Sequence, residues 1–160
     1  MLERVSAEVL AELERIAERA RGELVAAGLP MAPTGVAPVL AQGFEIEVDD
    51  GADGGGVFLS WQCHPRLRDV SSRAYREARF EDPAFRHHGK VTDIVIEAMG
   101  AILTAAGFAV RPTQDEYRLP AWEVTGAPPR GTPICWGVRS EETTLTGWQS
   151  PTASPGGSES

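Results

Sequence analysis

Two pairs of residues in the middle of the chain carry the side chains best suited to chemistry. Cys63-His64 and His87-His88 include all three histidines and one of the two cysteines. Thiolate and imidazole are zinc ligands, and a thiol activated by an imidazole can act as a nucleophile. Neither pair has C-x-x-C or H-x-x-x-H spacing, and neighbouring side chains point in different directions. We therefore predict no metal site and keep these four residues as catalytic candidates of a second hypothesis.

That second hypothesis is a small enzyme or ligand-binding domain with its Cys/His site between a sheet and helices. Asp93 and Glu97 would add two carboxylates one helical turn apart. Their ordinary interpretation is a solvated helix face. A lone cysteine such as Cys63 is, in the same way, usually a small buried apolar side chain. The sequence therefore favours a protein that is not an enzyme.

The acidic, glycine-rich stretch 49–56 resembles a calcium loop at first sight. With Asp49 at the first position of a 12-residue loop, Gly51 stands at the third and Ser60 at the twelfth. The carboxylate of the third position and the bidentate glutamate of the twelfth are therefore missing. The glycines also lack the G-x-G-x-x-G order of a nucleotide-binding turn. We interpret the stretch as a solvated hairpin tip, and we predict no cofactor.

The segment 64–90 is basic within an acidic chain. It holds seven arginine and lysine residues against four acidic ones, whereas the whole chain has a net charge of −8. Arginine and aromatic residues are enriched in protein interfaces, so we predict a docking surface for an acidic surface of another protein or for an anionic ligand. The alternative is an ordinary solvated helix face. The interaction candidates here are Trp61, Arg66, Arg73, Tyr75, Arg76 and Arg79.

The overall charge and hydropathy exclude several classes of partner. A net charge of −8 argues against general nucleic-acid binding, which depends on a basic surface. No uncharged apolar stretch of about 18 residues predicts a membrane span, and the charged N-terminus does not resemble a signal peptide. We therefore expect a cytoplasmic protein with reduced thiols and no disulfide between Cys63 and Cys135.

The elements that would position these residues follow from hydrophobic periodicity. Apolar residues recur every three or four positions over 2–27, which predicts a helix packed on its own sheet. The same stripe would also suit a partner helix, and thus a homodimer. Alternation of Phe44, Ile46 and Val48 with acids predicts a β-hairpin over 43–62. Helical patterns follow at 65–88, interrupted at Asp82-Pro83, and at 90–106.

The rest of the chain predicts further strands and a tail. Residues 108–111 read as a strand, and 117–124 as an edge strand, because Pro120 is compatible with an edge but not with a central position. Gly100 inside a helix predicts either close packing on a neighbour or a site that tolerates the cost of glycine. Residues 127–160 are rich in Pro, Gly, Ser and Thr, which predicts a disordered tail. Trp136 and Trp148 in that tail either pack back or form a motif that binds a partner.

Together these patterns predict the α+β class, with an antiparallel sheet covered by helices on one face. The expected order is a helix, a β-hairpin, a helix pair, one or two strands and a disordered tail. Residues 1–126 would form a single domain, and 127–160 a flexible tail. The first functional hypothesis is a small non-enzymatic protein-interaction module, resembling adaptors, immunity proteins or secretion-type chaperones in general layout only.

Overall fold

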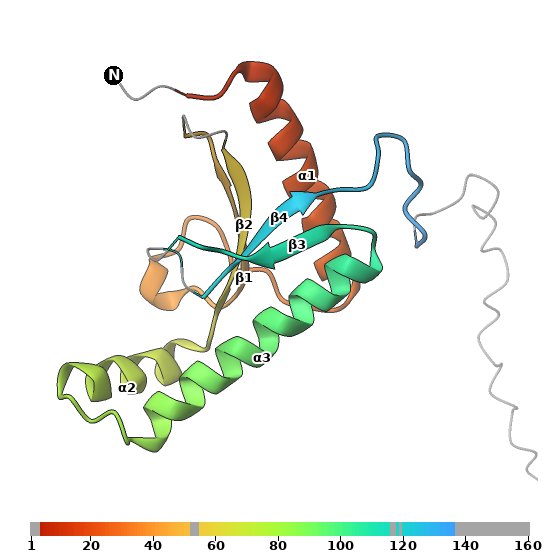
Figure 1. Cartoon of the computed structure of the whole chain (residues 1–160). Coiled ribbons are helices and arrows are strands. Elements are labelled where there is room, and N and C mark those ends of the chain that lie inside the picture. Colours follow the sequence, from red (N-terminus) through yellow and green to blue (C-terminus); the bar gives the residue numbers. More distant parts are fainter. Residues whose placement is uncertain (1–3, 52–54, 116–117, 119, 137–160) are drawn as a thin grey trace, which may run out of the picture. The chain divides into compact units, whose positions relative to one another are not determined.

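The computed structural model describes residues 4–51, 55–115, 118 and 120–136 (Figure 1). Its internal contacts group the chain into two units, Met1–Arg130 and Gly131–Ser160, which we describe separately. Among its described residues, the first unit contains three α-helices and one four-stranded antiparallel sheet, so the expected α+β class is confirmed. The tail predicted to be disordered falls mostly outside the described residues.

The first helix, α1 (Ala7–Ala26), begins where a capping residue stands. The Ser6 hydroxyl accepts a hydrogen bond from the Val9 amide at 3.3 Å, which satisfies an otherwise unpaired N–H of the first turn. Gly28, with φ of +87°, follows the helix end. The apolar stripe buries Ala20 and Leu24 in the domain's own core, as predicted for a helix on its own sheet.

The sheet contains β1 (Gly43–Asp49), β2 (Gly56–Gln62), β3 (Ala109–Pro112) and β4 (Trp122–Gly126) in the order β1-β2-β4-β3. The β-hairpin predicted over 43–62 is confirmed. The strand predicted at the edge is not an edge strand, because β4 lies between β2 and β3. Pro120 lies two residues before Trp122, the first residue of β4, and so removes no hydrogen bond from the strand itself. Tyr117 and Leu119 lie outside the described residues.

One face of the sheet forms the core. The register pairs Phe44 with Trp61 and Ile46 with Leu59, so the apolar residues of the alternating pattern share that face. The helices α1 and α3 (Pro83–Ala105) pack against it, and the core includes the buried side chains of Leu24 and Leu103. The opposite face carries the acids of β1 and the ring of Phe58.

The helix pair differs from the predicted boundaries. The pattern at 65–88 divides into α2 (Pro65–Arg76) and the beginning of α3, which runs through Gly89 without a break. Asp82 and Pro83 therefore begin a helix, although we predicted an interruption there. The Asp82 carboxylate accepts from the Ala84 amide at 2.9 Å, and proline suits the first helical position. Together α2, residues 77–82 and the first turns of α3 form a helical hairpin that projects beyond the sheet (Figure 1).

Two further features follow from the described helices. Gly100, as predicted, permits close packing, because it lies against the indole ring of Trp122. None of the helices that the structure describes combines the length and the apolar composition of a membrane-spanning segment.

Candidate protein-binding surface

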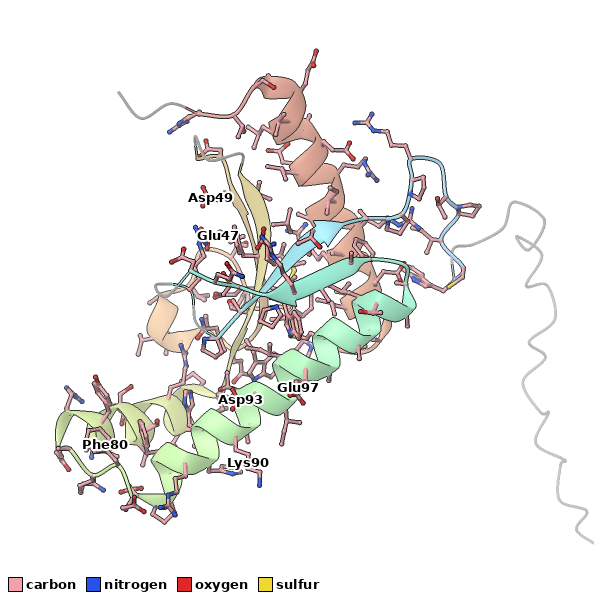
Figure 2. All side chains as sticks on the ribbon, in the orientation of Figure 1. Glu47, Asp49, Phe80, Lys90, Asp93 and Glu97 are labelled. Carbon is pink, nitrogen blue, oxygen red and sulfur yellow. The ribbon has the colours of Figure 1, made fainter. Side chains whose placement is uncertain are left out.

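Three aromatic rings gather at the tip of the helical hairpin. Tyr75 comes from the end of α2, Phe80 from the connection and Phe85 from the first turn of α3. Their ring centroids lie 5.9 to 6.2 Å apart. Tyr75 and Phe80 nevertheless remain 62% and 52% exposed, and Figure 2 shows Phe80 at the far end of the hairpin. We name these three rings the tip cluster.

A shallow apolar hollow lies between the two helices of the hairpin. Leu67 and Val70 of α2 line it with Ala84 of α3, and His64 and Arg66 complete its border. Its volume is about 350 Å³, and Val70 is 38% exposed. We name it the flank hollow. Exposed apolar side chains that recur on one projecting element are characteristic of interaction surfaces.

The charged side chains of the hairpin are only partly paired with one another. Arg73 contacts Asp69 at 3.0 Å, and Arg79 contacts Glu77 at 2.8 Å. Within the described part of the chain, Arg66, Arg76 and Lys90 form no ion pair. The hairpin therefore carries both paired and unpaired cations, and among the unpaired ones Arg66 borders the flank hollow.

Trp61 and Trp136 do not lie on the hairpin. Trp61 is half-buried and packs against the core from β2, with its side chain on the helix-covered face. Trp136 belongs to the second unit, where it is half exposed. Trp148 lies outside the described residues. Of the predicted interaction residues, the structure thus brings together Arg66, Arg73, Tyr75, Arg76 and Arg79 on one hairpin.

The Thr92 hydroxyl contacts the Cys63 thiol and donates to the His88 backbone carbonyl, whereas His64 and His87 are exposed. Cys63 is 3% exposed, and its Sγ lies 3.5 Å from the Thr92 hydroxyl. The exposed His64 caps α2, where its Nδ1 accepts from the Arg66 amide at 3.2 Å. His87 is exposed on α3. Cys63 and Cys135 are both free cysteines.

The fold alters the protonation of His88. Burial lowers the pKa of this imidazole below its ordinary value, and the positive charge of Arg68 lowers the pKa further. No hydrogen bond joins Cys63 to a histidine in the described ranges, and no three His, Cys, Asp or Glu residues there form a group that could hold a metal ion. Asp93 and Glu97 are exposed along α3 (Figure 2), the position of an ordinary solvated face.

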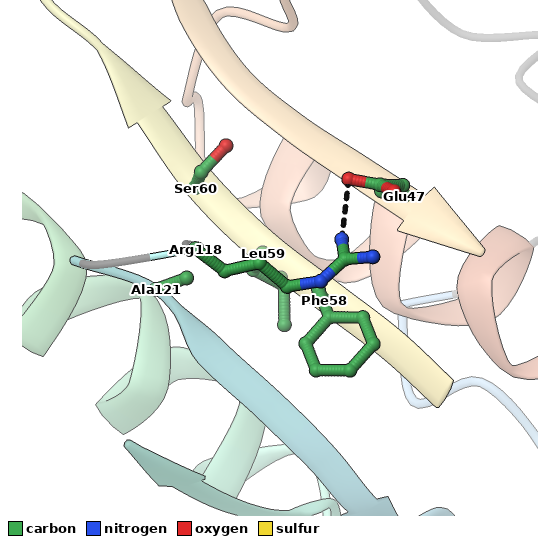
Figure 3. A pocket seen from close by; sticks show the side chains of 6 residues that line it. All are labelled: Glu47, Phe58, Leu59, Ser60, Arg118 and Ala121. Atoms are coloured by element: carbon green, nitrogen blue, oxygen red, sulfur yellow. Dashed lines mark ion pairs between the residues drawn. The ribbon is translucent and has the colours of Figure 1, made fainter. Parts of the chain in front are cut away.

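One charged cluster, centred on Arg118, was not predicted from the sequence. Arg118 lies on the outer face of the sheet, where its guanidinium contacts Glu47 at 2.7 Å, Asp49 at 2.8 Å and Asp115 at 3.2 Å. Figure 3 shows this side chain crossing the ring of Phe58, whose centroid is 4.4 Å from its Cζ.

The hydrogen bond to Glu47, together with the nearby carboxylates, raises the pKa of Arg118. Its contact with Asp49 joins residues 69 positions apart in the sequence, so no local sequence pattern predicts it. The cluster fastens the residues before β4 onto the sheet, and we regard it as structural.

The described residues therefore offer two kinds of feature. The hairpin presents exposed rings, an apolar hollow and unpaired cations, which are features of a surface that binds another molecule. The Cys/His residues present a buried thiol and a helix cap, which are features with a role in the fold. Comparison with known protein families, with characterised proteins and with solved structures finds no match for this chain.

Proposed function

We propose that this chain is a non-enzymatic, cytoplasmic protein-interaction module that binds its partner through the α2–α3 hairpin. The observation that carries the proposal is the exposure of Val70, Tyr75 and Phe80 on an element that projects from the core. The core of the domain is complete without these side chains. Exposing them to water is unfavourable by about 25 cal/mol per Å² of apolar surface, so a partner that covers them gains that free energy.

The charges of the hairpin indicate the chemistry of the partner. Arg66 borders the flank hollow, and Arg76 ends α2 near the tip cluster. A segment with acidic side chains beside apolar ones would cover the apolar groups and pair with these cations. An amphipathic helix with an acidic border has this composition, and helices commonly bind in grooves between helices. We therefore infer an acidic, amphipathic segment of another protein as the binding partner.

The enzyme hypothesis has less support. A nucleophilic cysteine must be reachable and ionised, whereas Cys63 is buried beside the Thr92 hydroxyl. Within the described ranges the side chain that contacts this thiol is Thr92, and no histidine is hydrogen-bonded to it.

Site-specific photo-crosslinking tests the proposed function. A benzophenone amino acid replaces Tyr75 in the full chain, and a second chain carries it at Val25, which is 51% exposed at the end of α1. Both are irradiated in lysate from the native cells, and the crosslinked peptides are sequenced by mass spectrometry. We expect an adduct specific to position 75 whose peptide contains acidic and apolar residues.

A matched pair of variants then separates the hairpin from the rest of the surface. Val70→Asp places a charge in the flank hollow, whereas Val9→Asp places one on a similarly exposed site of α1. Affinity for the captured segment should fall by at least about tenfold for Val70→Asp only, because an unpaired charge then meets apolar surface. Equal crosslinking from positions 75 and 25, no adduct at all, or a basic captured peptide would each contradict the proposal.

A further inference from the structure

The outer edge of β1 is an open position of the sheet. Among the described strands, β1 has a neighbour on one side only. Phe44 shows where the edge lies, because its N–H donates to the Pro30 carbonyl and its carbonyl accepts from the Ala32 amide, both at 2.9 Å. The backbone groups of successive residues in an antiparallel strand alternate between its two sides. Those of Ile46 and Val48 therefore point to the same outer edge as those of Phe44.

Short segments close this edge at both ends of β1 and leave its middle free. Residues 30–32 pair with the beginning of the strand, and just beyond its end the Val5 amide donates to the Asp50 carbonyl at 3.0 Å. Between these two contacts, no backbone group of the described residues bonds to the outward N–H and C=O of Ile46 and Val48. Two donors and two acceptors are therefore available to an added strand.

A groove runs beside this free part of the edge. The segment that pairs with Phe44 leaves β1 after Ala32, and Gly35, with φ of +78°, lies in the turn that follows. The groove has a volume of about 510 Å³ and is lined by residues 31–34, residues 44–47 and Arg21 of α1. An extended segment of a few residues would lie here and complete the pairing of the middle of β1.

The side chains of β1 indicate which strand would fit. Glu45, Glu47 and Asp49 alternate with apolar residues and share the outer face of the sheet (Figure 2 labels the last two). Arg118 pairs with both Glu47 and Asp49, so three carboxylates against one guanidinium leave an excess of negative charge. Neighbouring side chains on one face of a sheet stabilise it when their charges are opposite. A strand with lysine or arginine at alternate positions therefore matches this face.

A second copy of this chain does not match the edge. Antiparallel pairing of β1 with the β1 of another copy through the outward groups places acids opposite acids in every register, for example Glu47 opposite Glu47. Like charges directly opposite one another destabilise a sheet, and charged side chains protect sheet edges against self-association. The acids that exclude a second copy are the ones that select a basic strand.

We propose that the middle of β1 binds an extended, basic segment of another protein, which adds a strand to the sheet through the backbone of Ile46 and Val48. Its lysine or arginine side chains pair with Glu45 and Glu47, and the residues between them are apolar. In strand addition the backbone hydrogen bonds supply affinity, and the alternating side chains supply specificity. The edge of β1 and the α2–α3 hairpin are separate surfaces, so this inference is independent of the proposed function.

Nuclear magnetic resonance of the ¹⁵N-labelled full chain tests this proposal. The probe is the capped synthetic peptide Thr-Lys-Val-Lys-Val-Lys-Thr, titrated at pH 7 and physiological salt. We expect the amide proton signals of Ile46 and Val48 to move downfield saturably and their exchange with water to slow, because both N–H groups gain acceptors. The amides of Glu45 and Glu47, which face β2, should keep their exchange rates.

Control peptides separate strand addition from simple attraction between charges. The peptide Lys-Lys-Lys-Thr-Thr-Val-Val has the same composition without the alternation, and a third peptide has glutamate in place of each lysine. Neither of these should change the two amides. Methylation of the valine amides of the probe should abolish an antiparallel pairing, whereas methylation of its lysine amides should abolish a parallel one, because each removes the N–H groups that face β1.

A pair of charge variants connects binding to the edge. Glu45→Lys reverses a charge beside the groove, whereas Glu97→Lys makes the same change on the exposed face of α3. The affinity for the probe should fall by at least about tenfold for Glu45→Lys and stay unchanged for Glu97→Lys. The methylated peptides need no change in the protein, so they test the pairing even where Glu45→Lys does not fold.

Several results would overturn the proposal. Amide signals of Ile46 and Val48 that stay in place up to millimolar probe show that the edge accepts no such strand. Equal shifts with the peptide that lacks alternation, with both methylated peptides, or in the Glu45→Lys variant show that the probe does not pair with this edge. Slow exchange of the two amides in the free chain shows that the edge is already occupied.

Discussion

Two glycines of the same helix should respond in opposite ways to the same substitution. Gly89 and Gly100 both lie inside α3. A Cβ atom at Gly89 would meet no atom within 4 Å, whereas one at Gly100 would lie 2.9 Å from Cε2 and 3.1 Å from Nε1 of Trp122. The backbone requirement is the same at both sites, so the tertiary contact is the main difference.

The magnitudes follow from this difference. Replacing a helical glycine with alanine stabilises a protein by about 0.5–1 kcal/mol where nothing obstructs the methyl group. We expect that gain for Gly89→Ala. At Gly100 the methyl group would overpack the indole, which costs about 1–3 kcal/mol, and it would disturb the bond from Trp122 to Ile96, worth about 1 kcal/mol. We therefore expect Gly100→Ala to be destabilising by about 1–3 kcal/mol after the propensity gain.

Urea and thermal unfolding followed by circular dichroism measure both free energies. For a domain of this size, 1 kcal/mol corresponds to roughly 3–5 °C in Tm. The double variant Gly100→Ala with Trp122→Phe should lose less than the sum of the two single variants, because the smaller ring relieves the clash. A Gly100→Ala protein as stable as Gly89→Ala would refute the reasoning, since Trp122 would then not be tightly packed on α3.

Three further predictions concern charges. Arg118→Gln should lower the free energy of unfolding by about 1–2 kcal/mol, because it removes a cation–π contact and three carboxylate contacts from a side chain that is 21% exposed. Urea unfolding measures this loss, which should be smaller at high salt because salt screens ion pairs. Hydrogen bonds from Arg15 and Arg130 lower the pKa of Glu12 from 4.5 to about 2. The contribution of these bonds to the free energy of unfolding should therefore be complete above pH 4.5 and disappear as the pH falls toward 2. Acid unfolding of the Glu12→Gln variant should lack this pH-dependent loss. The pKa of His88 is lowered from 6.5, so the unfolded chain binds this proton more readily than the folded protein, and the free energy of unfolding should decline as the pH falls below 6.5. The His88→Gln variant should show a smaller decline. An NMR titration in which the His88 imidazole gains its proton above pH 6.5 would contradict this prediction.

Local signals in the sequence predicted most of the elements. The alternation of Phe44, Ile46 and Val48 was enough to predict the β-hairpin, because one buried face requires a period of two. The helix pair was predicted with wrong boundaries although its signals were present. Asp82-Pro83 can start a helix as well as break one, and in the structure it caps the start of α3, where Phe85 stacks on Tyr75.

The candidate surface was predicted in part. The basic segment and Tyr75 pointed to the hairpin, but the apolar members of the surface, Val70 and Phe80, look like core residues in a sequence. Their exposure depends on how far α2 and α3 reach beyond the sheet. Trp61, the other aromatic candidate, shows the converse ambiguity: an aromatic residue in a strand can face the core or the solvent, and here β2 turns it toward the core.

The sequence by itself determined the class of the fold, the presence of the β-hairpin over 43–62 and the basic character of the 64–90 segment, because each depends on patterns among residues close together in the chain. Only the tertiary structure decided that β4 is an inner strand, that Trp122 rests on Gly100 and that Arg118 reaches Asp49. These contacts join positions far apart in sequence, and their partners are selected by packing of the whole core.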